Sequence, residues 1–230
     1  TSLIKLNNDF KIYWNKSPIG RLIPGKEYLN PKIELIVDDI LEQDQRKKLV
    51  KFLEKWLKNK IDLVLKSLVD LKDLKEKNSS IKALAYQLYE NNGVLKREQV
   101  SEYLKNLGQD ERKILRDLGV KFGRYHVFLY KLIKPDAVSL RTMLWKNYNQ
   151  KYFNFKPPTF GLNFLEDNNL KNKNFMLLCG FEKFDNLYLR IDILERLFMQ
   201  IINSNSKQGN EIKMIPEMLN LLGCNKENFK

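Results

Sequence analysis

The sequence predicts a mainly α-helical protein with small β elements, an α+β fold, and three observations support this class. Between residues 40 and 148, apolar residues recur mostly at three- and four-residue steps, as in amphipathic helices. Short β-rich runs bounded by turn residues occupy the first 37 residues and the region after residue 174. A chain of 230 residues with 43% hydrophobic residues can form real cores. We therefore expect an N-terminal β-meander, a central helical bundle and a small C-terminal α/β piece.

The N-terminal meander is predicted from short runs that alternate with turn residues. The runs are 10–14, 19–23 and 32–37, and the breaks are 15–18 and Pro24-Gly25. The acidic pair Asp38 and Asp39 follows the last run. Adjacent acids ahead of a helix are more typical of capping than of a metal site.

The central helices are predicted from apolar stripes that end at Asn or Gly. The stripe over residues 40–77 is longer than a usual helix, so we expect one long helix or two in series. Residues 120–129 are aromatic and β-rich, and are predicted as one extended segment. The remaining predicted helices span 81–91, 97–107, 110–118 and 135–148.

The domain prediction has three parts: 1–148 as meander plus bundle, 149–174 as a linker-like segment, and 175–230 as a small α+β subdomain. The middle part loses periodicity and contains Pro157-Pro158. In the last part, 175–181 and 187–190 are predicted strands, and 191–202 and 216–222 are predicted helices. The chain starts without Met and stops inside a helix-like run, so we expect a fragment of a longer protein.

The formal net charge of +13 favours association with polyanions. The basic residues are 32 Lys and 9 Arg and Asn is abundant, so drift of codons in an AT-rich genome is an alternative source of this charge. Cys179 and Cys224 have no metal-ligand spacing and are predicted to be free thiols of a reduced compartment. With no secretory signal and no long apolar run, a cytoplasmic location is expected.

No complete active site is visible in the sequence. It lacks the Gly-x4-Gly-Lys-Ser/Thr phosphate loop, the Gly-x-Gly-x-x-Gly turn and a paired acidic metal motif. A stand-alone enzyme would require the fold to bring scattered acids such as Asp192 and Glu195 into a cleft. We therefore predict no catalytic residue and no metal ligand.

Basic and aromatic residues interleave around residue 125, a combination that can hold single-stranded nucleic acid through phosphates and stacked bases. The alternative is a core strand whose rings face inward. The only histidine, His126, has a structural, an RNA-contacting or a catalytic role, and no Ser, Cys or acidic residue lies close to it in sequence to form a dyad. The predicted nucleic-acid-binding residues are Lys121, Arg124, Tyr125, His126, Lys131, Lys134 and Arg141.

Several blocks together resemble a known protein family. The two strongest are Leu-Gly-Val-Lys-Phe-Gly-Arg-Tyr-His-Val-Phe-Leu at 118–129 and Pro-Glu-Met-Leu-Asn-Leu-Leu-Gly-Cys at 216–224. The others, in chain order with these, are 12–25, 83–88, 93–95, 115–117, 132–135 and 144–145. They resemble the region C-terminal to the motor domains in bacterial, alphaproteobacterial-type relatives of the mitochondrial degradosome RNA helicase, a superfamily 2 DExH helicase.

The resemblance implies a non-catalytic accessory region of an ATP-dependent RNA helicase that contacts single-stranded RNA, with DNA as an alternative, or positions the duplex. ATP and magnesium are then expected only for the parent helicase, a hydrolase whose motor domains lie upstream and act as partners. An alternative function is a protein docking scaffold for an exoribonuclease or for self-association. Trp56, Trp145 and Phe198 would carry that docking.

Overall fold

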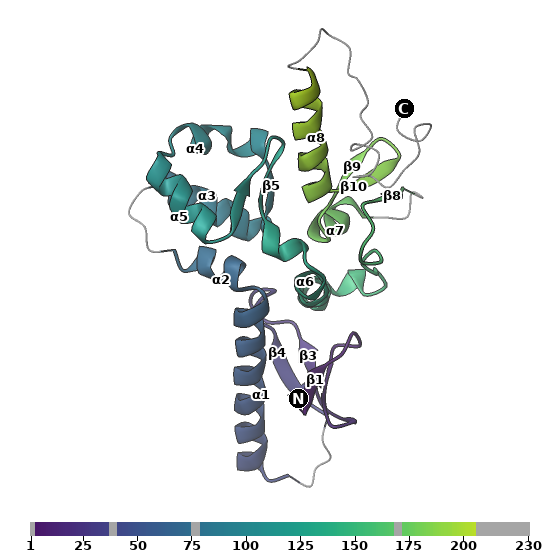
Figure 1. The fold of residues 1–230 in the computed structure, drawn as a ribbon. Helices are drawn as coiled ribbons and strands as arrows, with labels where there is room; N and C mark the ends of the chain where they lie inside the picture. The colour runs from purple at the N-terminus through teal and green to yellow at the C-terminus, as the bar shows by residue number, and fades with distance from the viewer. Residues whose placement is uncertain (1–2, 37–40, 75–78, 168–171, 206–230) are drawn as a thin grey trace. The chain divides into compact units, whose positions relative to one another are not determined.

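The computed structural model describes residues 3–36, 41–74, 79–167 and 172–205. The fold is α+β, as predicted, with an N-terminal four-stranded antiparallel meander, central helices, and a small C-terminal sheet with helices (Figure 1). The chain divides into two compact units, Thr1–Lys66 with Asp136–Lys156, and Ser67–Pro135 with Pro157–Lys230. Each unit thus combines two separate stretches of the chain.

This division differs from the sequence boundaries at 148 and 174. Part of the predicted linker packs on the N-terminal meander, since the ring of Phe153 meets the ring of Phe10 edge-on at 4.7 Å. Residues 157–174, also predicted as linker, belong to the second unit and include a strand. Contacts between segments distant in the chain, such as Phe10 with Phe153, cannot be deduced from periodicity.

The first unit carries the meander, in which each strand is antiparallel to the next. Its strands are β1 (Ile4–Leu6), β2 (Lys11–Trp14), β3 (Ser17–Ile23) and β4 (Lys32–Leu35). Helix α1 (Gln43–Val64) lies alongside β4 in Figure 1. Its Leu53 is fully buried, and a Cβ at Gly20 of β3 would come within 3.6 Å of the Leu53 Cδ1. The apolar stripe of α1 therefore covers the sheet.

Helix α6 (Pro135–Tyr148) and the 3₁₀ turn η3 (Gln150–Tyr152) complete the first unit. Pro135 opens α6, as predicted, because its missing N–H would have no partner in the first turn. At the other end of α6, Trp145 stacks on Tyr152 at 5.0 Å and the Lys146 ammonium donates to the Phe155 carbonyl at 3.0 Å. These contacts fold the chain after α6 back onto the helix.

The second unit contains the shorter helices. They are α2 (Lys66–Lys72), α3 (Ser79–Glu90), the 3₁₀ turn η1 (Arg97–Val100), α4 (Ser101–Lys105) and α5 (Gln109–Asp117). Of the two alternatives for 40–77, one long helix or two in series, the structure has the second, α1 followed by α2. Gly119 has φ +94°, a left-handed conformation that glycine adopts without strain, and its N–H donates to the Arg116 carbonyl at 2.8 Å. This turn ends α5 and lets the next strand begin at residue 120.

A three-stranded antiparallel sheet follows, in the order β5-β7-β6. Its strands are β5 (Val94–Lys96), β6 (Val120–Phe122) and β7 (His126–Leu129). The prediction of one extended segment over 120–129 is wrong: β6 and β7 form a hairpin in which Phe122 pairs with Val127. All four residues of the central strand β7 are buried. Because all four are buried, β7 shows no alternation that would separate it from β6 in the sequence.

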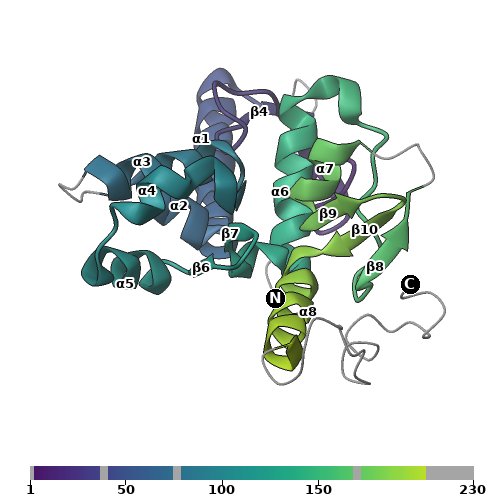
Figure 2. The same ribbon diagram turned by 90° about the horizontal axis from the view of Figure 1, so that it is seen from above.

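The C-terminal part of the second unit has the strand order β8-β10-β9, also antiparallel (Figure 2). Its elements are β8 (Phe164–Glu166), α7 (Lys173–Leu178), β9 (Phe181–Phe184), β10 (Leu187–Arg190) and α8 (Ile191–Asn205). The predicted strand 175–181 is wrong, because most of it is α7. The Asn172 side chain caps that helix by accepting the Phe175 N–H at 3.0 Å. The predicted strand at 187–190 and the predicted helix at 191–202 are confirmed.

Among the described residues, no helix combines the length and the apolar character that crossing a membrane would require. Cys179 is buried and forms no disulfide with any described residue, as predicted. The predicted helix at 216–222, Cys224 and the 216–224 block lie outside the described residues, as do Asp38 and Asp39.

Candidate functional site

The candidate site is built around the turn between β6 and β7. The Gly123 N–H donates to the His126 carbonyl at 2.8 Å and closes the hairpin. Arg97 binds the carbonyls of the turn: its backbone N–H donates to Tyr125 at 2.7 Å and its guanidinium donates to Gly123 at 2.8 Å. The turn therefore has fixed backbone partners on its carbonyl side.

The amide side of the turn is bound by one carboxylate from α8, that of Glu195. It accepts the backbone N–H groups of Arg124, of Tyr125 at 2.9 Å and of His126 at 2.8 Å. A Cβ at residue 123 would lie 2.7 Å from the Glu195 Oε1 and closer still to its Cδ and Oε2. Gly123 is thus the residue that lets the carboxylate approach the backbone.

The imidazole of His126 lies between two buried carboxylates. Its Nδ1 is 3.2 Å from the Glu195 Oε1, and its Nε2 is 3.2 Å from the Glu182 Oε2 on β9. His126 is 2% exposed, Glu182 4% and Glu195 9%. Lys96, opposite His126 in the β5–β7 pairing, places its ammonium 3.4 Å from the Glu182 Oε1. The cluster therefore joins β5, β7, β9 and α8.

The electrostatics of the cluster favour a protonated ring. Burial alone lowers the pKa of His126, but hydrogen bonds to Glu182 and Glu195 and their negative charges outweigh it, so this pKa is raised. Burial raises the pKa of Glu182, but His126 and Lys96 lower it by more, so this pKa is lowered overall. Burial also raises the pKa of Glu195. The His126 ring and three backbone N–H groups lower it by more, so the pKa of Glu195 is lowered overall. An imidazolium can donate to both carboxylates, and together with the Lys96 ammonium it balances their two negative charges.

Apolar packing supports the same elements. Val94 of β5, Phe128 of β7 and Ile191 of α8 form one buried cluster, flanked by Ile133 and Leu177. The first turn of α8 is therefore held against the sheet by a small core. Glu195 follows Ile191 by four residues, on the same side of the helix, which brings its carboxylate to the hairpin turn.

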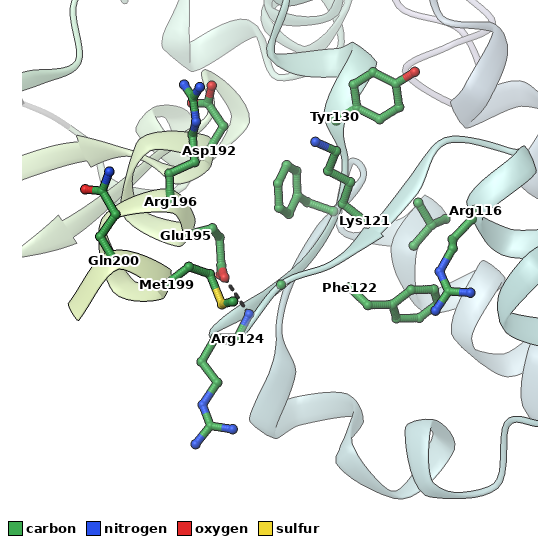
Figure 3. Close-up of a pocket in the computed structure, with 13 residues that line it drawn as sticks. Arg116, Lys121, Phe122, Arg124, Tyr130, Asp192, Glu195, Arg196, Met199 and Gln200 are labelled. Carbon is green, nitrogen blue, oxygen red and sulfur yellow. Dashed lines mark hydrogen bonds between the residues drawn. The ribbon is translucent and has the colours of Figure 1, made fainter. Parts of the chain in front are cut away.

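A groove of about 930 Å³ opens beside this cluster. Figure 3 shows residues of β6 and of the end of α5 on one side and residues of α8 on the other, joined where Glu195 binds the Arg124 N–H. Four cations line it, Arg116, Lys121, Arg124 and Arg196, against two carboxylates, Asp192 and Glu195. We call it the cationic groove. A second cavity of about 460 Å³ shares Arg124 with it.

The cations of this region lie over aromatic rings. The Lys121 ammonium is 5.1 Å from the Tyr130 ring centre, and the Arg124 guanidinium is 5.9 Å from that of Phe198. The guanidinium of Arg116 lies 5.7 Å from the Phe122 ring centre. The three rings therefore lie under cations and orient their charges. This arrangement differs from both sequence alternatives, base stacking and inward packing.

The predicted binding residues fall into three groups. Lys121 and Arg124 are exposed and line the cationic groove, and Tyr125 is 45% exposed and lines the second cavity. Lys131 and Lys134 are exposed but do not line the groove. His126 and Arg141 are buried, and Arg141 belongs to the first unit. The burial of His126 agrees with a structural role, one of the alternatives that the sequence left open.

Sequence reasoning missed Arg116, Arg196 and the role of Glu195. The spacing of Asp192, Glu195, Arg196 and Met199 marks one face of a helix and could have identified a polar face. The partner of that face could not be identified, because Glu195 and His126 are 69 residues apart in the chain.

The structure brings Asp192 and Glu195 to one groove, the condition set for a stand-alone enzyme. Both carboxylates already have partners: Asp192 accepts two bonds from the Arg190 guanidinium, at 2.6 and 3.2 Å, and Glu195 is bound by the turn. Within the described ranges, no group of three His, Cys, Asp or Glu residues is placed to hold a metal ion. The pair therefore gives no support to a metal-dependent or general-base mechanism.

Three comparisons with known proteins give no further assignment. Neither the protein-family models, nor the curated proteins, nor the solved structures contain a match to this chain.

Proposed function

We propose that this chain is a non-catalytic accessory region of an ATP-dependent RNA helicase and that its cationic groove binds single-stranded RNA. The observation that carries the proposal is the groove itself, which Arg116, Lys121, Arg124 and Arg196 line from a hairpin and two helices. The resemblance of the 118–129 block to the helicase family supports the same proposal, because this block supplies two of the four cations.

The chemistry of the groove suits a phosphate backbone. Of its two carboxylates, Asp192 is paired with Arg190 and Glu195 with the turn and His126, so the four cations dominate the potential. Guanidinium and ammonium groups bind phosphates by charge-assisted hydrogen bonds and release condensed counterions. Rings beneath three of the cations limit their motion and so reduce the entropy lost on binding.

Fluorescence anisotropy with a labelled single-stranded RNA tests this function. The variant Lys121→Ala/Arg124→Ala/Arg196→Ala removes three groove cations, and its Kd is expected to rise at least tenfold, since one hydrogen bond to a charged group contributes about 1.5–3 kcal/mol. The matched control is Lys131→Ala/Lys134→Ala, which removes exposed charge outside the groove. A Kd that rises in both variants in proportion to the charge removed, three cations against two, would contradict a groove-specific site.

A second candidate function, protein docking, is favoured by exposed apolar side chains on α1. Phe52 is 50% exposed and Leu63 79% exposed. They are 11 residues apart, close to three helical turns, and so lie on one face. Sedimentation equilibrium of the wild type and of Phe52→Lys/Leu63→Lys tests self-association through this face. A strictly monomeric wild type would count against it.

A further inference from the structure

The His126 cluster, through Glu195, lies where the two sides of the cationic groove meet. Glu195 of α8 binds the hairpin turn, where three consecutive backbone amides donate to its carboxylate, and Phe198 of the same helix packs edge-on against the Tyr125 ring at 4.6 Å. That carboxylate also faces the Nδ1 of His126. Glu195 and His126 thus link the two sides of the groove. Arg124 lies on one side and Arg196 on the other.

We propose that protonated His126 is the positioning residue of the cationic groove: bound to both Glu182 and Glu195, it holds α8 against the hairpin turn, and loss of its proton releases them. This inference rests on the proposed function for its effect on RNA, while its structural part concerns the chain alone. His126 acts through Glu195 on the turn that presents Arg124.

Geometry gives the reason for proton dependence. A neutral imidazole carries one N–H, so it can donate to only one of the two carboxylates, and its other nitrogen would present a lone pair to an anion. Both carboxylates lie 3.2 Å from ring nitrogens, and all three side chains are buried. Deprotonation would leave the two buried carboxylates with one bridging proton fewer. Their mutual repulsion would then separate β9 from α8.

Other charged groups near the ring do not replace its proton. Lys96 faces Glu182 from β5, and Arg97 is bound to the turn carbonyls. Lys183, next to Glu182 on β9, pairs with Asp167, and the Arg124 guanidinium points over Phe198. Tyr188 of β10 is buried, and burial raises its pKa, so its hydroxyl stays neutral. None of these groups places a cationic side chain against the Glu195 carboxylate. Among them and His126, the His126 ring is the side-chain counterion of Glu195.

The test uses the fact that the chain has a single histidine. In one isotopically labelled sample of the chain, NMR follows the His126 ring signal and the backbone amides of Arg124, Tyr125 and His126 from pH 5 to 9. We expect the ring to titrate above about 6.5, and the three amide signals to move over the same pH range. Glu182→Gln should shift the midpoint to lower pH, whereas the exposed Glu102→Gln should not.

The RNA measurement is separate. Above the folded pKa of His126, the Kd of the wild type for single-stranded RNA should rise by up to about tenfold per pH unit, the limit for one linked proton. His126→Gln should bind with a flatter pH profile. Because a variant at a buried site can unfold, the ring titration of the wild type decides the structural part.

Each outcome has a defined meaning. A ring that titrates at or below about 6.5, or amides that do not follow it, overturns the inference. An RNA pH profile identical in the wild type and in folded His126→Gln also overturns it. If ring and amides titrate together but no RNA binds at any pH, the proposed function fails and the positioning of the turn by His126 stands.

Discussion

The carboxylate of Glu195 binds His126 twice: it accepts the backbone N–H at 2.8 Å and lies 3.2 Å from the ring Nδ1. One side chain of α8 is therefore tied to both the main chain and the side chain of the same residue in β7. The two residues are 69 positions apart, so this pair closes a large loop of the second unit. Disturbing either residue should affect both the stability of this unit and the position of Arg124.

Glu195→Gln separates positioning from simple charge. The new amide NH₂ would face the Arg124 N–H, donor against donor, and the turn should lose about 1–3 kcal/mol of stabilisation. Removing a negative charge from the groove would by itself tighten RNA binding, yet positioning predicts a higher Kd. Asp192→Asn, one turn earlier on α8, removes the same charge from the same groove. Anisotropy should show weaker binding only for Glu195→Gln; tighter binding in both would contradict a positioning role.

Gly123→Ala tests the close approach of the carboxylate without changing any charge. Its Cβ would overlap the Glu195 carboxylate, and such overpacking costs about 1–3 kcal/mol. Gly108→Ala is the matched control, because its Cβ would meet only the Glu111 side chain, which can move. Urea denaturation followed by circular dichroism measures both. Equal stability of the two variants would show that Glu195 does not require the bare backbone at residue 123.

Stability should depend on pH in two ranges. The raised pKa of His126 means that its contribution is complete below about 6.5 and is lost as pH rises through the folded pKa. The lowered pKa values of Glu182 and Glu195 mean that their contributions are present above about 4.3 and are lost as pH falls through their folded values. Urea midpoints should therefore be highest between these ranges.

His126→Gln provides the control for this profile. The variant should lose the decline on the alkaline side that comes from the histidine, while keeping an acid decline from its carboxylates. A wild-type midpoint that rises with pH between 7 and 9 would contradict the protonated ring, since it has the opposite sign.

Salt dependence reports the number of phosphates bound. If all four groove cations contact phosphates, the slope of log K against log salt for single-stranded RNA should be about −3, from about −0.7 per contact. Arg116→Ala should reduce its magnitude by about 0.7. Lys134→Ala, exposed and outside the groove, should leave it unchanged. A slope near zero would indicate that the positive charge of the chain reflects codon composition.

The sequence predicted the parts of the fold that depend on local interactions. The meander, the long helix followed by α2, and α8 were predictable because periodicity and turn residues are local signals. The hairpin at 120–129 was missed because all four residues of β7 are buried and so show no alternation. The helix α7 was missed because Phe175, Met176 and Leu178 make a short apolar run that fits a strand equally well.

The candidate site was predictable only in part, for the same reason. Lys121 and Arg124 stand in one conspicuous basic and aromatic segment, and both line the groove. Arg116 lies at the end of α5, five residues before Lys121, while Arg196 reaches the groove from α8. The choice for His126 between structure and RNA contact depended on Glu182 and Glu195, 56 and 69 residues away. Such long-range pairings are set by the tertiary fold.

The most direct test of RNA binding in the cationic groove is an NMR titration of the labelled chain with a short oligouridine at low salt. The side-chain Nε–H signals of Arg116, Arg124 and Arg196 report on the guanidinium groups themselves. The account predicts that these three signals shift together and saturate with the oligonucleotide, while the signal of Arg190, paired with Asp192, moves little. Saturating shifts confined to other arginines, or no shifts at all, would contradict it.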